Sequence, residues 1–135
     1  MGSDIPKQQG TCGCGCSAEC GETLLMTCAG ASKNGDMTYL AARRLSKRGF
    51  GRFFCLAGIG AGIDEKKEDA KKAYRRIVLD GCPKKCAANT LKKAGIMDNI
   101  EIVYSDSGLK VSGDGPSERE IEDFTDYVVS KILKK

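Results

Sequence analysis

The chain has 135 residues, of which 41% are hydrophobic and 30% charged, and its formal net charge is +4. This length fits one domain with a core of its own, and the charge is too small to indicate a nucleic-acid partner. Eight residues are cysteine and none is histidine. The missing histidine excludes a Ser-His-Asp triad, a Cys-His nucleophile pair, a mixed Cys/His zinc finger and a helical HExxH motif. Thiols, carboxylates, amines, hydroxyls or a bound metal must carry any chemistry.

The first 22 residues are rich in Gly, Ser, Gln and Cys and contain no large apolar residue after Ile5. Such a segment cannot pack a core, so we expect a flexible, Cys-rich arm over 1–22 and an α/β domain over 23–135. The start of the chain lacks the apolar stretch of a secretory signal, and no run approaches the ~20 apolar residues of a membrane span. We therefore expect a cytoplasmic protein with reduced thiols and no membrane partner.

Four apolar segments bounded by turn residues predict strands. They lie at 23–30, 52–58, 75–81 and 99–106. Apolar residues at helical spacing, together with end signals, predict helices between and after these strands. The helices run from an N-cap at Asp36 to Gly49, from an N-cap at Asp64 to about Tyr74, from Pro83 to Ala94, and from about Pro116 to Lys135, and a glycine-rich loop spans 58–62.

Strands that alternate with helices indicate an α/β fold with a parallel sheet. Right-handed crossovers then favour a small, doubly wound, mostly parallel four-stranded sheet in the order 2-1-3-4, with helices on both faces. The carboxyl ends of such strands share one edge of the sheet, which is where open α/β sheets bind their ligands.

Cysteines follow the predicted strands at this edge. Cys28, Cys55 and Cys82 end the first three strands, and Cys86 lies one helical turn further on. Four converging thiols predict an all-cysteine tetrahedral metal site, with zinc as the leading metal and copper(I) or an iron–sulfur cluster as alternatives. The competing interpretation is a set of buried strand-end cysteines with one incidental surface thiol.

The surroundings of these cysteines favour thiolates. Cys86 is predicted in the first turn of a helix, where backbone N–H groups stabilise anions, and Lys84 and Lys85 add positive charge. Glycines beside the cysteines let backbone N–H groups approach sulfur. These glycines are Gly30, Gly58, Gly60 and Gly81.

Three short blocks resemble those of the DGC-domain family, which is named for its Asp-Gly-Cys motif. The blocks are CAGAS at 28–32, CLAGIG at 55–60 and DGCPKKC at 80–86, within a resemblance over about residues 24–106. The family is regarded as zinc-binding through four cysteines, which the resemblance assigns to Cys28, Cys55, Cys82 and Cys86. Many members carry Cys-Ser-Gly-Cys-Ser in the first block, whereas this chain has alanine at 29 and 31. A mechanism that needs an extra resolving cysteine is therefore disfavoured.

A second group of cysteines lies in the predicted arm. It consists of Cys12, Cys14, Cys16 and Cys20, in the pattern C-G-C-G-C-x3-C. Alternating Cys-Gly resembles metallothionein-like clusters that wrap Cu(I), Zn²⁺ or Cd²⁺. The arm would then hold its own metal or pass metal to the core site; alternatively, it is a disordered tail with oxidation-prone thiols.

Other thiol signatures are missing: no cysteines are spaced C-x2-C, and none of the core cysteines begins a C-x5-R phosphatase loop.

The leading hypothesis is a non-enzymatic protein that stores, buffers or delivers zinc, because four thiolates leave no open position for catalysis. Its partners would be the metal ion and a metal- or thiol-exchanging protein, with no nucleic acid. A thiol redox or sulfur-transfer protein and an iron–sulfur electron carrier remain alternatives. Basic residues concentrate in 33–52 and 84–93, and we expect these segments either to attract an anionic partner or to form ordinary solvated helix faces.

Overall fold

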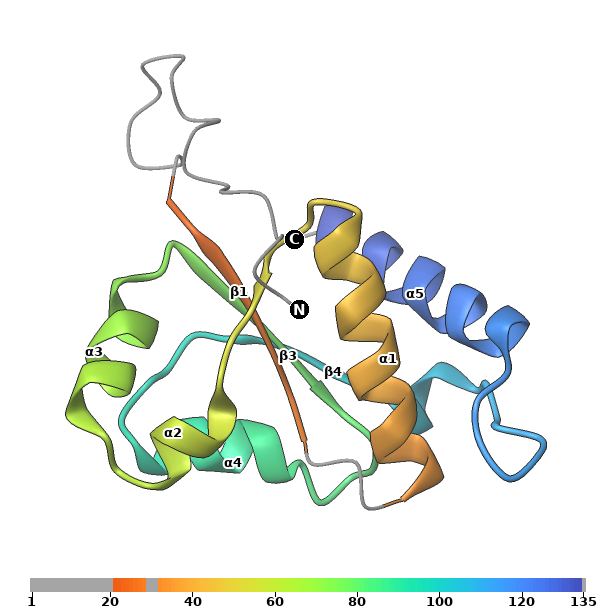
Figure 1. Ribbon diagram of the computed structural model, residues 1–135, viewed down its shortest axis with the longest axis horizontal. Coiled ribbons are helices and arrows are strands. Elements are labelled where there is room, and N and C mark those ends of the chain that lie inside the picture. The colour runs from red at the N-terminus through yellow and green to blue at the C-terminus, as the bar shows by residue number, and fades with distance from the viewer. Residues whose placement is uncertain (1–20, 29–31, 135) are drawn as a thin grey trace, which may run out of the picture.

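The structure, a computed structural model, describes residues 21–28 and 32–134. Its centre is a parallel sheet in the order β2-β1-β3-β4 (Figure 1), which confirms the predicted topology. The strands are β1 (Thr23–Thr27), β2 (Arg52–Phe53), β3 (Arg75–Asp80) and β4 (Ile100–Val103). All but the last two residues of the predicted arm lie outside the described part of the chain.

The two central strands are apolar along their length because both faces of the sheet are covered. Leu24, Leu25 and Met26 of β1 are fully buried, as are Ile77, Val78 and Leu79 of the neighbouring strand β3. Alternate side chains point to opposite faces, so Leu25 joins one core and Leu24 and Met26 join the other. This explains why continuous apolar runs, rather than alternating ones, marked these strands.

Helices cover both faces of the sheet, and those on one face are longer than those on the other (Figure 1). The long helices α1 (Lys33–Lys47) and α5 (Glu118–Leu133) pack on one core with the 3₁₀ turn η4 (Tyr104–Ser107). The shorter helices α2 (Leu56–Gly60), α3 (Asp64–Lys72) and α4 (Cys86–Lys93) lie at the other. Within the described ranges no helix is long and apolar enough to cross a membrane.

The predicted start of α1 was wrong by one turn. Ser32, not Asp36, is its N-cap, and the Ser32 hydroxyl accepts a hydrogen bond from the Gly35 amide at 3.1 Å. Asp36 lies in the first turn instead, where the positive end of the helix dipole stabilises its carboxylate. Helix α5 begins with a capping box in which Ser117 and Glu120 satisfy each other's amides.

Three other boundaries differ from the prediction. Strand β2 has only two residues, and the predicted glycine-rich loop is largely helix α2. Ile63 rather than Asp64 precedes α3 as its N-cap. Pro83 lies before α4, in a turn closed by the Lys85 amide donating to the Cys82 carbonyl at 3.1 Å. Proline suits the second position of such a turn because its φ is already set.

Candidate functional site

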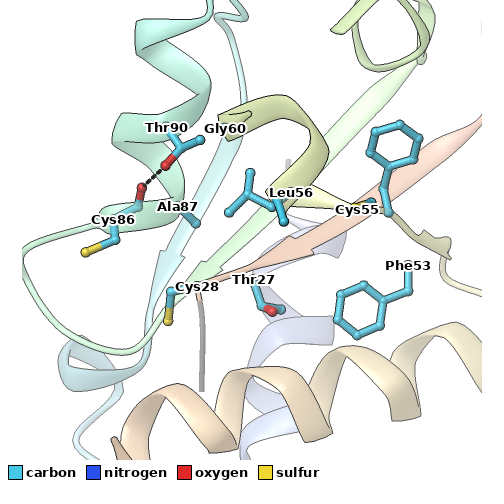
Figure 2. A pocket seen from close by; sticks show the side chains of 11 residues that line it. Thr27, Cys28, Phe53, Cys55, Leu56, Gly60, Cys86, Ala87 and Thr90 are labelled. Carbon is cyan, nitrogen blue, oxygen red and sulfur yellow. Dashed lines mark hydrogen bonds between the residues drawn. The ribbon is translucent and has the colours of Figure 1, made fainter. Parts of the chain in front are cut away.

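A cavity of about 430 Å³ opens at the carboxyl edge of the sheet, beside β1, β2, α2 and α4 (Figure 2). Cys28, Cys55 and Cys86 all contribute to its wall. The rest of the wall is largely apolar: Phe53, Phe54, Leu56, Ala57, Gly60 and Ala87, with the hydroxyl-bearing Thr27 and Thr90. The fold thus brings three thiols from three distant segments to one hollow.

Cys28 is anchored at the end of β1. Its amide donates to the Leu79 carbonyl at 3.2 Å, which continues the ladder with β3. Its Sγ lies 3.6 Å from the Thr38 hydroxyl, which itself donates to the Gly35 carbonyl at 2.7 Å. Because the Thr38 proton is committed to Gly35, the thiol is the donor to Thr38. Cys28 is the least exposed of the four cysteines.

Cys55 starts helix α2. Its Sγ accepts a hydrogen bond from the Gly58 amide at 3.3 Å, so a thiol takes the place of the usual Ser, Thr or Asp cap. The Gly58 amide is therefore a hydrogen-bond donor already in place beside this sulfur. The expected approach of a glycine N–H to sulfur is found here.

Cys82 and Cys86 flank the turn that leads into α4, and both side chains are exposed. Cys86 is the first residue of the helix, directly after Lys85. Lys85 adopts a left-handed conformation with φ 52°, and its Nζ lies 3.5 Å from a Glu101 carboxylate oxygen. Cys82 is not part of the cavity wall, so the structure places the fourth thiol in the adjoining loop.

Asp80 fixes this loop to the helix behind it. The carboxylate is only 2% exposed and accepts hydrogen bonds from the Ala87 and Ala88 amides at 2.8 and 3.1 Å. Burial raises the pKa of Asp80, and the two amide hydrogen bonds oppose that shift. Asp80 therefore acts as a cap for α4. Asp64, the other acid–base candidate, lies at the start of α3 with a 93% exposed side chain and does not contribute to the cavity wall.

Gly81 has a different role from the one its sequence position indicated. A Cβ atom at Gly81 would lie 2.8 Å from the Asn34 carbonyl carbon and 2.8 Å from the Gly35 nitrogen. The backbone before Cys82 therefore packs directly on the first turn of α1. Sequence reasoning assigned this glycine to a contact with sulfur and missed its contact with the helix.

The thiols stand at one edge without forming a ready metal site. Across residues 21–28 and 32–134, no three cysteine, aspartate or glutamate side chains are grouped so that they could hold a metal ion. In Figure 2, Cys28 and Cys86 lie on one side of Leu56 and Cys55 on the other. The donor set suits a soft or borderline metal, since it consists of free thiols alone. Such a metal would have to draw the cysteines together.

The second predicted cluster lies outside the described residues. Its members are Cys12, Cys14, Cys16 and Cys20. The arm cluster therefore stays a prediction.

The fold and its cysteine-lined edge define a small cysteine-containing α/β protein. A family model described as the DGC domain matches residues 24–128, so the chain belongs to the DGC-domain family and the resemblance is confirmed. A curated relative is the anaerobic and virulence modulator AnvM of Pseudomonas aeruginosa, 26% identical over 87 residues. The match covers 64% of this chain and 66% of AnvM, slightly less than two thirds of that relative. No solved structure matches the chain significantly.

Proposed function

We propose that this protein binds zinc through four thiolates at the carboxyl edge of the sheet and stores, buffers or delivers the metal in the cytoplasm. The observation that supports this proposal most is the shared cavity wall of Cys28, Cys55 and Cys86. Cys82, on the loop between β3 and α4, supplies the fourth ligand. Free thiols in an intracellular α/β domain more often bind metal or perform redox work than form disulfides.

Metal binding would couple to a local rearrangement. Because the cysteines of the described residues are not grouped for a metal beforehand, the exposed turn that holds Cys82 and the cysteine side chains would move toward the ion as it binds. Each thiol releases its proton on coordination, so zinc affinity rises with pH. The Cys55 Sγ already accepts the Gly58 amide hydrogen bond, and a metal-bound sulfur can keep this contact.

The charges around the edge suit a negatively charged thiolate cluster. Lys84 and Lys85 lie between Cys82 and Cys86 in the chain, and the first turn of α1 packs on Gly81 beside them. Positive side chains and helix N-termini both stabilise anions nearby. A filled four-thiolate shell leaves no position for a substrate, which favours holding or transferring the metal over hydrolysis.

The test is anaerobic zinc titration of the full chain against a chromophoric chelator. Replacing Cys82 or Cys86 by serine should lower zinc affinity by more than about 100-fold, since loss of a direct ligand exceeds the usual effect of a residue behind the ligands. Cys20→Ser, which removes one thiol from the arm, is the matched control and should keep the core affinity. A fully folded wild-type chain that binds neither zinc nor cobalt would contradict the proposal.

A second candidate function is thiol exchange, either redox or sulfur transfer. The observation in its favour is Cys86, an exposed thiol on the first residue of α4 and part of the cavity wall. Alkylation rates of the metal-free protein measured against pH distinguish the two functions. A thiol-exchange protein requires one thiol that ionises well below about pH 8.5. If every thiol is instead alkylated with an ordinary pH dependence, thiol exchange is excluded and metal binding is the function that remains. An iron–sulfur carrier would be coloured when purified without oxygen, and a zinc protein colourless.

A further inference from the structure

The sulfur of Cys28 lies against a buried hydroxyl of helix α1. Figure 2 shows the Cys28 side chain pointing from the end of β1 toward this helix, and its Sγ is 3.6 Å from the Thr38 Oγ1. Thr38 is fully buried, whereas Cys28 is partly exposed and belongs to the cavity wall. Of the four cysteines that the structure describes, only Cys28 has a side-chain hydroxyl within hydrogen-bonding distance of its sulfur.

The first turn of α1 holds the Thr38 hydroxyl in place. The hydroxyl donates to the Gly35 carbonyl at 2.7 Å, and the Gly35 amide in turn donates to the Ser32 hydroxyl. The same turn packs on Gly81, the residue before Cys82. These contacts fix the Thr38 oxygen beside the sulfur, while rotation about the bond between Cβ and Oγ1 is enough to redirect its proton.

Loss of the Cys28 proton changes what this contact requires. In the metal-free protein the thiol donates to Thr38, because the hydroxyl proton is used at Gly35. A sulfur that binds a metal has released its proton and only accepts hydrogen bonds. An oxygen lone pair facing such a sulfur is repelled, whereas an O–H group facing it forms a charge-assisted hydrogen bond. The Gly35 carbonyl lies within α1 and has a second lone pair for the backbone amide four residues on, so it can release the hydroxyl.

We propose that Thr38 is a positioning residue of the metal site, whose hydroxyl accepts from the Cys28 thiol without metal and donates to the Cys28 sulfur when a metal is bound. The Cys28 proton leaves to solvent, a sulfur lone pair forms the bond to the metal, and no electron is transferred. Hydrogen bonds to a ligand from residues behind it orient the ligand and change metal affinity about 10–100-fold. This inference rests on the proposed zinc function.

The test compares variants that remove the same hydroxyl from two similar places. Thr38→Val replaces the hydroxyl by a methyl group, and Thr38→Ala removes it without adding one. Thr125→Val is the matched control, because Thr125 is also fully buried and its hydroxyl also donates to a helix carbonyl, that of Ile121, at 2.7 Å. Of the two hydroxyls, only that of Thr38 contacts a cysteine sulfur of the described residues. Thr38→Ser keeps the hydroxyl and tests for rescue.

Anaerobic zinc titration of the full chain against a chromophoric chelator measures the affinity. Thr38→Val should bind zinc about tenfold more weakly than the wild type, whereas Thr38→Ser and Thr125→Val should keep nearly the wild-type affinity. With cobalt in place of zinc, the sulfur-to-cobalt charge-transfer absorption should move to longer wavelength in Thr38→Val. The reason is that a hydrogen bond lowers the energy of the electrons that the sulfur donates, and hydrogen bonds to ligand sulfurs tune a bound metal in this way. A loss of stability alone leaves this band in place.

Infrared spectra of the metal-free protein test the other half of the exchange. The S–H stretching band of Cys28, identified by its loss in Cys28→Ser, should move to higher frequency in Thr38→Val, because the thiol loses its acceptor. An unchanged S–H band, an unchanged zinc affinity and cobalt band, or an equal loss of affinity in Thr125→Val overturns the inference and leaves the zinc function standing. If the wild type binds neither zinc nor cobalt, the proposed function itself is wrong, and the role of Thr38 falls with it.

Discussion

The contact between Gly81 and helix α1 can be tested by one methyl group. In Gly81→Ala the new Cβ would meet the Asn34 carbonyl carbon and the Gly35 nitrogen at 2.8 Å each, and the Asn34 Cβ at 3.1 Å. All of these atoms belong to, or are attached directly to, the backbone, so no side-chain rotation relieves the overlap. The loop or the first turn of α1 must shift instead.

Overpacking of this kind costs about 1–3 kcal/mol. With a urea dependence of about 2 kcal/mol per molar, the midpoint of unfolding should fall by about 0.5–1.5 M at an unchanged slope. Because the backbone beside Cys82 must be held in the metal-bound state as well, and this substitution destabilises its packing on α1, zinc affinity should fall with stability. Equilibrium unfolding in urea, followed by circular dichroism, measures the first effect, and the chelator titration measures the second.

Gly60→Ala is the matched control. The nearest atom to its added Cβ is the Thr90 Cγ2 at 3.6 Å, which is an ordinary contact, and Gly60 lies in helix α2. Alanine in a helix is more stable than glycine by up to about 1 kcal/mol, so this variant should equal or exceed the wild type. A Gly81→Ala protein that unfolds at the wild-type midpoint would refute the packing argument.

Two further predictions concern charges on α5. Hydrogen bonds, chiefly from the Ser112 hydroxyl, lower the pKa of Glu120 from 4.5 to about 2, so its stabilising effect is present above pH 4.5 and is lost as the pH falls toward 2. Unfolding midpoints of Glu120→Gln should therefore vary less with pH in this window than those of the wild type; equal pH dependence would contradict this. Glu122 pairs with Arg44 and Arg48 of α1, and Glu122→Gln should cost roughly 0.2–1 kcal/mol per pair in dilute buffer and almost nothing in 1 M salt. A loss that persists at 1 M salt would show that the pairs do not act by charge.

The sheet could be predicted because its signals are local and redundant. The apolar runs of β1 and β3 each lie between turn residues, and the alternation with helices leaves few possible strand orders. Helix α5 was predicted for the same reason, since its apolar residues recur at helical spacing; the capping box that starts it was recognised only in the structure. The boundary of β2 was wrong because Cys55 uses its sulfur as a helix cap, a role that its residue type rarely takes.

The candidate site was predictable only in outline. Strand ends place the cysteines at one edge, but side-chain directions and loop paths decide which of them share a cavity. In the view of Figure 2, Leu56 lies between Cys55 and the other two thiols of the cavity, and no residue pattern predicts this. The packing of Gly81 on Asn34 joins segments far apart in the chain, so it too appears only once the fold is built.

The central claim is that the cysteines at the carboxyl edge bind one zinc ion per chain. The most direct measurement is the zinc content of anaerobically purified protein in which Cys12, Cys14, Cys16 and Cys20 are all serine, so that only the core thiols remain. We predict about one zinc per chain in this protein, and almost none when Cys82→Ser is added. Zinc content near zero before that last substitution, or unchanged after it, would contradict the account.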